Sequence, residues 1–202
     1  MAKNARYCVQ FRRRREGKTD YRIRKSLVIS GKPRLVARCT LRNVIAQIVI
    51  AKPHGDEVLV SAHSRELKKY EWKAPLGNLP SAYLTGLLCG VKAKKKGLKE
   101  AILDLGLHSP SKGARVFAVL KGVLDAEISV PYSEDKIPDQ KRIEGEHIVQ
   151  YAKSLASSNS EEYQSRFSEY LKQNFPPEDL PKYFSKTKKE ILAAFKVGGK
   201  KA

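Results

Sequence analysis

Three short runs rich in β-branched residues follow one another in the sequence, at residues 34–38, 43–51 and 57–62. The separators between them, residues 40–42 and 53–56, have the lengths of hairpin loops, so the pattern predicts three sequential antiparallel strands. The middle run, NVIAQIVIA, is almost continuously apolar. Such a run is typical of a strand buried on both faces, which predicts helices packed over the sheet.

Helical periodicity follows these strands. From Pro80, a residue favoured at the first helical position, apolar residues recur at Leu84, Leu87, Leu88 and Val91. Residues 100–106 are expected to form a strand that ends in a glycine turn, and residues after Pro110 a second helix with one apolar face. Strands followed by helix, strand and helix predict an α/β layered domain that ends near Pro131.

The N-terminal segment has too few apolar positions to fold alone, so residues 1–18 are expected to form an extended arm. A short helix is predicted after it, starting at Thr19 or Asp20 and ending before Gly31. Ile23 and Leu27 would form its apolar stripe. Arg22 and Lys25 would then point away from that stripe.

Beyond residue 131 the pattern is helical and more polar. Capping-box spacings at Ser158 and Glu161, and at Thr187 and Glu190, predict two helix starts. The apolar faces of these helices are narrow, so we expect them to dock on the α/β domain or on a neighbouring protein. The predicted organisation is an arm at 1–18, an α/β domain at 19–131 and a helical extension at 132–202.

Charge is strongly segregated along the chain. The 40 Lys and Arg residues exceed the 21 Asp and Glu residues, giving a net charge of +19. Residues 1–42 hold 14 basic and 2 acidic residues, a net +12, whereas residues 123–181 carry a net −6. This distribution predicts a polyanion, most simply nucleic acid, as the partner of the N-terminal part, and a different role for the acidic part.

A membrane partner is not expected. No window approaches the roughly 18 consecutive apolar residues of a membrane span, and the N-terminal 15 residues lack the apolar stretch of a secretory signal peptide. An interfacial binder would need bulky apolar anchors beside its charge, and the arginine run has none.

Motifs for catalysis are absent from the sequence. The four histidines and the three cysteines Cys8, Cys39 and Cys89 are scattered, without the spacing of a metal site or a redox pair. Asp104, near the end of a predicted strand, leaves a metal-dependent RNA nuclease as the alternative function, but such chemistry needs several converging carboxylates. We therefore expect no enzyme activity, no cofactor and no metal, and interpret Asp104 as a strand-end capping or surface residue.

Four consecutive arginines, residues 12–15, stand near Tyr7, Phe11 and Tyr21. Arginine offers a planar fork that matches phosphate oxygens and also stacks on bases, so this composition suits an RNA of irregular shape. Basic residues continue into the first predicted strand and recur as a lysine cluster at 68, 69 and 73. For Lys94 to Lys96 two interpretations stay open: contact with RNA, or a helix end that complements the helix dipole.

Several stretches together resemble one known family. They are RRRREGKTDY at 12–21, GKPRLV at 31–36, SAHS at 61–64, GNLPSAYLTGLL at 77–88 and LGLHSP at 105–110. The chain is similar over about residues 5–155 to the 5S rRNA-binding ribosomal protein family of the large subunit, universal family eighteen, in its archaeal and eukaryotic form. The acidic tail resembles the archaeal long form more loosely.

The resemblance implies a ribonuclease H-like α/β fold without nuclease activity, since function depends on the site rather than the fold. It implies a cytoplasmic protein of the large (50S) subunit that binds 5S rRNA, attaches it to 23S rRNA, contacts neighbouring ribosomal proteins and forms part of the central protuberance. A general RNA chaperone without preference for 5S rRNA is the competing binding function. Carried over by position, the expected RNA-binding residues are Arg12, Arg13, Arg14, Arg15, Lys18, Tyr21, Arg22, Lys25, Lys32, Arg34, Arg38, Arg42 and Asn43.

Overall fold

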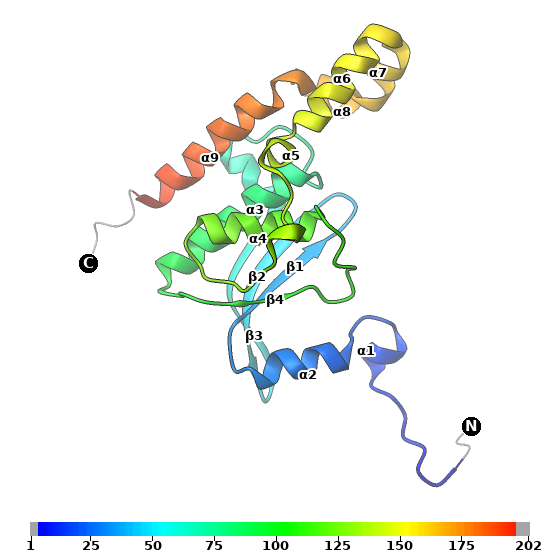
Figure 1. The fold of residues 1–202 in the computed structure, drawn as a ribbon, viewed down its shortest axis with the longest axis vertical. Helices are drawn as coiled ribbons and strands as arrows, with labels where there is room; N and C mark the ends of the chain where they lie inside the picture. The colour runs from blue at the N-terminus through cyan, green and yellow to red at the C-terminus, as the bar shows by residue number, and fades with distance from the viewer. Residues whose placement is uncertain (1–3, 197–202) are drawn as a thin grey trace.

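A four-stranded sheet organises the computed structural model, which describes residues 4–196 (Figure 1). The strands are β1 (Arg34–Cys39), β2 (Val44–Lys52), β3 (Gly55–His63) and β4 (Ile102–Asp104), in the order β3-β2-β1-β4. The first three pair antiparallel, and β4 joins β1 in parallel. The predicted three-strand meander and the later strand are therefore confirmed.

The helices of the predicted α/β layers are also present: α2 (Tyr21–Ile29), α3 (Leu79–Lys95) and α4 (Arg115–Asp125). Asp20 caps α2, its carboxylate accepting the backbone N–H groups of Arg22 and Ile23. Asn78 caps α3 in the same way through Ser81, with Pro80 in the first turn. A 3₁₀ helix, η1 (Ser64–Tyr70), connects β3 to the loop before α3.

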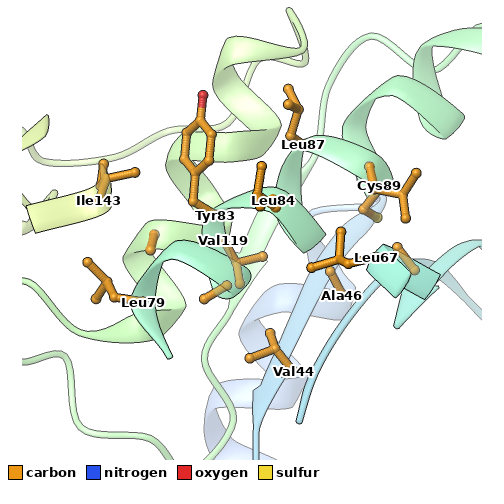
Figure 2. Packing of buried hydrophobic residues seen from close by; sticks show 14 of the residues in the cluster. Val44, Ala46, Leu67, Leu79, Tyr83, Leu84, Leu87, Cys89, Val119 and Ile143 are labelled. Atoms are coloured by element: carbon orange, nitrogen blue, oxygen red, sulfur yellow. The ribbon is translucent and has the colours of Figure 1, made fainter. Parts of the chain in front are cut away.

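One face of the sheet forms the core. Its inward side chains, Leu35, Ala37, Val44, Ala46 and Ile48, are all fully buried. Figure 2 shows Val44 and Ala46 on the sheet with the α3 side chains Leu84 and Cys89 over it, while Tyr83 points away from the sheet. Helices α3 and α4 thus cover this face.

The opposite face is covered less completely than the sequence predicted. Along β2, Ile45 and Gln47 on this second face are only half-buried, although Val49 is buried, and no residue of α2 is fully buried. The expectation that β2 is buried on both faces is therefore met only in part on this face, where polar side chains and one short helix, α2, take the place of a second apolar layer.

The C-terminal helices extend the same core. They comprise η2 (Glu134–Lys136), α5 (Gln140–Glu144), α6 (Glu146–Ser158), α7 (Ser160–Arg166), α8 (Ser168–Lys172), η3 (Pro177–Asp179) and α9 (Leu180–Lys196). Helix α9 lies along α3: the rings of Phe184 and Tyr83 are 5.4 Å apart, and the Thr187 hydroxyl donates to the Tyr70 carbonyl at 3.2 Å. These contacts confirm that the C-terminal helices dock on the α/β layers.

Both predicted capping boxes are wrong. Asn159, not Ser158, caps α7, because its side chain accepts the N–H groups of Glu161 and Glu162. Thr187 lies inside α9 and is buried, so its hydroxyl serves a tertiary contact and not a helix start.

The arm is not wholly extended. Arg12–Arg15 form a single helical turn, α1, and the Arg12 guanidinium pairs with Glu16 at 2.8 Å. Residues 1–3 of the predicted arm and 197–202 of the predicted extension lie outside the described residues. Within residues 4–196, no helix combines the length and apolarity needed to cross a bilayer.

Candidate nucleic-acid interface

Basic side chains alternate along β1 and so emerge on the partly open face of the sheet. Arg34, Val36 and Arg38 occupy every second position, and period-two alternation places them on one face. The register pairs Val36 with Gln47 on β2 and with Asp104 on β4. This face is therefore polar and charged at its centre.

Five charged side chains form a continuous series on this face, hereafter the charge network: Arg24, Asp56, Arg34, Asp104 and Arg38. Arg24 binds both oxygens of Asp56, at 2.9 and 2.7 Å, and Arg34 reaches the same carboxylate at 2.6 Å. Arg34 also pairs with Asp104 at 2.8 Å, and Arg38 completes the series at 3.0 Å. The alternating signs link α2, the β2–β3 hairpin, β1 and β4.

Burial distinguishes the two β1 arginines. The Arg34 side chain is 2% exposed and engaged with two carboxylates, whereas that of Arg38 is 39% exposed. A guanidinium held in this way cannot turn toward a phosphate without giving up its ion pairs with both Asp56 and Asp104. Arg34 is accordingly an internal support of the surface, not one of its exposed contacts.

Each carboxylate of the charge network accepts hydrogen bonds from several donors. The Arg24 guanidinium, with help from Arg34, lowers the pKa of Asp56 from 3.8 to about 2, against an opposing effect of partial burial. Asp104 also accepts the Gly106 backbone N–H at 2.9 Å, and the Arg38 guanidinium binds the Asp104 carbonyl at 2.8 Å. Asp104 thus does cap the strand end, as expected, but it is buried rather than on the surface.

Helix α2 faces the sheet with a different side from the predicted one. Tyr21, Arg24 and Leu27 are half-buried, whereas Ile23 is 49% exposed. Because Arg24 pairs with Asp56, the helix side that faces the sheet contains Arg24 and Leu27, and not the predicted stripe of Ile23 and Leu27. Arg22 and Lys25 are exposed on the outer side, as predicted.

A cavity of about 550 Å³ separates α2 from the open face of the sheet. Of the predicted RNA-binding residues, it is lined by Arg13, Lys18, Tyr21, Arg34 and Arg38. Arg24, Gln47 and Asp56 also line it. The sequence analysis did not predict these three residues. Only Arg24 could have been found from sequence, because its i+3 spacing from Tyr21 places both residues on the same side of the predicted helix.

The arm continues this surface outward. All four arginines of α1 are exposed; Arg13 donates to the Thr19 hydroxyl at 2.9 Å, and the Phe11 and Tyr21 rings lie 4.9 Å apart. These contacts set the arm beside α2 (Figure 1). We call the solvent-accessible predicted RNA-binding residues from α1 through α2, together with that of β1, the arm–sheet surface; its members are Arg12, Arg13, Arg14, Arg15, Lys18, Tyr21, Arg22, Lys25 and Arg38.

Arg42 and Asn43 lie elsewhere, at the β1–β2 turn. They line a separate hollow of about 960 Å³ together with Lys68, Lys73 and the buried Trp72. The Asn43 backbone closes the turn with Thr40, and Arg115 braces the hollow by donating to the carbonyls of Thr40 and Gly77 at 2.8 and 2.7 Å. We call Arg42, Asn43, Lys68 and Lys73 the hairpin surface.

The remaining candidate, Lys32, pairs with Glu100 at 2.7 Å between the end of α2 and β4. The lysines at the end of α3 are mostly engaged in structure: Lys94 pairs with Glu127 at 2.5 Å, and Lys96 donates to the Leu59 carbonyl at 2.6 Å. For these two lysines the contacts favour the structural interpretation over RNA contact.

The carboxylates of the charge network face arginines. One Asp104 oxygen accepts from Arg34 and the other from Arg38. Asp56 accepts from the other terminal nitrogen of Arg34. Within residues 4–196, no three His, Cys, Asp or Glu side chains are grouped as they would be to hold a metal ion.

A comparison with protein families adds an independent finding. The model of one family, described as ribosomal large subunit proteins 60S L5 and 50S L18, matches residues 5–100 and 91–133 of this chain. The matched residues comprise more than half of the chain and contain both basic surfaces, the sheet and helices α2, α3 and α4.

Proposed function

Since the chain belongs to the family of the ribosomal large-subunit proteins 60S L5 and 50S L18, we propose that it binds 5S rRNA through the arm–sheet surface. The observation that supports this most is the convergence of the basic arm, α2 and the open sheet face on one side of the molecule (Figure 1). Membership of the family makes the chain a protein of the large ribosomal subunit; the RNA it binds and the surface it uses are the proposal.

The side chains suit an irregular RNA. The guanidinium group of each exposed arginine can bind two oxygens of one phosphate. The adjacent rings of Phe11 and Tyr21 offer a surface on which an unpaired base can stack. The neighbouring cavity is bounded by the fixed groups of the charge network, so this part of the surface is organised before RNA arrives.

Binding can be measured by fluorescence anisotropy of labelled 5S rRNA, with tRNA as competitor. We expect 5S rRNA to be preferred, and affinity to fall roughly 10³- to 10⁵-fold between 50 and 200 mM salt if six to ten phosphates are neutralised. Replacing Arg12 to Arg15 by alanine should weaken binding and reduce the salt slope by up to about 3, because each neutralised phosphate adds roughly 0.7 to 0.9 to that slope.

A matched control removes four charges elsewhere. Lys99, Lys153, Lys172 and Lys189 are exposed and have no ion pair among the described residues. Their alanine variant should change affinity far less than the arginine variant. Equal losses would mean that net charge alone drives binding, and equal affinity for tRNA would favour the general RNA chaperone.

The hairpin surface supports a second RNA contact, which we propose to be with 23S rRNA. It lies beyond the C-terminal end of β1, whereas α2 is anchored through Asp56 beside Arg34 at the N-terminal end. A six-residue strand spans about 20 Å, so one molecule can present α2 and the hairpin surface to different RNAs. Immobilised 5S rRNA should capture 23S rRNA only when the protein is present. The triple alanine variant of Arg42, Lys68 and Lys73 should lose this capture and retain 5S rRNA.

We further propose that the protein lies with 5S rRNA in the central protuberance, with the acidic helices directed toward a basic neighbouring protein. Helices α6, α7 and α8 lie at the opposite end of the molecule from α2 (Figure 1). Deleting residues 132–202 would not test this, because Ile143, Phe184 and Ile191 belong to the core. Reversing the exposed charge of Glu161 should lower incorporation into subunits while 5S rRNA binding persists.

The proposed role is that of a structural protein and not of an enzyme. The nuclease alternative predicts magnesium-dependent cleavage of RNA that is lost in the Asp104→Asn variant. We expect purified protein to leave 5S rRNA intact with magnesium present.

A further inference from the structure

We propose that Asp56 is a positioning residue that holds α2, and with it the arm, in the orientation that binds RNA. The inference rests on the proposed function but concerns a residue that carries the same sign of charge as RNA. Asp56 stands at the start of β3, at the tip of the β2–β3 hairpin, between the guanidinium groups of Arg24 and Arg34.

Helix α2 has little else to hold it. None of its residues is fully buried, and Ile23, Val28 and Ile29 are 49%, 37% and 73% exposed. The ion pairs that the preceding residues make, those of Arg12 and Lys18 with Glu16, are local to the arm. The bidentate pair of Arg24 with Asp56 is therefore the main directional contact between α2 and the sheet.

The Asp56 carboxylate is itself held in place by the other members of the charge network. Arg34 is buried and binds both Asp56 and Asp104, and Asp104 is fixed in turn by Arg38 and by the Gly106 backbone. A carboxylate held in this way gives Arg24 one place to bind. Such preorganisation raises affinity because less freedom is lost on binding.

The sign of the effect distinguishes this proposal from simple electrostatics. A carboxylate beside an RNA surface repels phosphate, so its neutralisation should strengthen binding if charge alone matters. If Asp56 positions α2, the same neutralisation should weaken binding, because the arm loses its orientation.

The test compares Asp56→Asn with Glu57→Gln by anisotropy on labelled 5S rRNA. Glu57 is the adjacent residue of the same strand, is exposed and pairs only with Lys52 among the described residues, so its variant removes the same charge one position along the strand, on the opposite face. We expect about a tenfold weaker affinity for Asp56→Asn, one factor of ten being a modest loss of preorganisation, and no weakening for Glu57→Gln.

Amide hydrogen exchange measures the local stability of α2 separately from the global stability of the protein. In Asp56→Asn, the amides of α2 should exchange faster while those of α3 keep their protection. Arg24→Gln releases the helix from its own side and leaves Arg34 with both carboxylates. In that background, Asp56→Asn should weaken binding no further.

The outcomes separate the two proposals. If the wild-type protein does not prefer 5S rRNA, the proposed function fails. If the wild type binds but Asp56→Asn binds equally well or more tightly, or if α2 keeps its protection, the positioning role of Asp56 is overturned and the proposed function stands.

Discussion

Gly86 of α3 and Gly122 of α4 lie against each other where the two helices cross. A methyl group at Gly122 would come within 2.2 Å of the Tyr83 carbonyl, and one at Gly86 within 2.1 Å of the Val119 carbonyl. Since these neighbours are backbone atoms inside helices, neither can turn aside. The two helices that cover the sheet therefore pack by backbone contact.

Gly122→Ala is accordingly expected to destabilise the protein, by about 1–3 kcal/mol or more, because a well-packed crossing must separate to admit the methyl group. Urea unfolding followed by circular dichroism measures this. Ser165→Ala, at an exposed position of α7, should change stability by less than about 0.5 kcal/mol. Equal stability of Gly122→Ala and wild type would contradict the close crossing.

Two of the predicted RNA-binding arginines should behave differently when replaced by alanine. Arg34→Ala removes charged hydrogen bonds to Asp56 and Asp104 while each carboxylate keeps one arginine, so it should cost about 1.5–3 kcal/mol of stability. Arg42 is exposed at the turn, so Arg42→Ala should stay within about 0.5 kcal/mol of wild type. Thermal unfolding of both variants makes the comparison; a stable Arg34→Ala protein would show that the charge network is dispensable.

Acid should weaken the fold partly through Asp56. Its pKa is lowered from 3.8 to about 2 by Arg24 and Arg34, so its ion pairs stabilise the protein above about pH 4 and are lost as the pH falls toward 2. Because solvent screens this partly exposed carboxylate, the contribution stays below about 2 kcal/mol. The stability difference between wild type and Asp56→Asn, measured in urea at pH 5 and at pH 3, should shrink at the lower pH; a constant difference would argue against this titration.

The thiols should differ in reactivity by position. Cys8 is exposed, Cys39 is half-buried, and burial raises the pKa of Cys89 to about 12. A disulfide reagent should titrate one fast thiol in the native protein, lost in Cys8→Ser, and reach Cys89 only after unfolding. Fast labelling of Cys89 in the native protein would show that the core opens readily.

Much of the fold could be predicted because its signals are local. Hairpin-length separators and β-branched runs predicted β1 to β3, and capping residues such as Asp20 predicted the start of α2. The arginines at 34 and 38 could be placed on one face by their spacing alone. The local pattern failed where tertiary contacts competed with it, as at Thr187, which has the spacing of a helix cap but lies inside α9.

The roles within the site could not be predicted for the same reason. Arg34 is buried because Asp56 and Asp104 meet it from 22 and 70 residues away in the sequence. Nothing in the residues next to Arg34 distinguishes it from Arg38. Likewise, Arg24 rather than Ile23 faces the sheet because a carboxylate of the hairpin tip lies opposite it.

The packing of α9 bears on the order in which the parts become available during synthesis. Lys186 and Thr187 meet Glu71 and Tyr70 across 115 and 117 residues of sequence, so that contact forms only after residue 187 has been synthesised. Arg24 needs only the next 32 residues to find Asp56. During synthesis, the arm, α2 and Asp56 are thus available well before α9, which packs on α3.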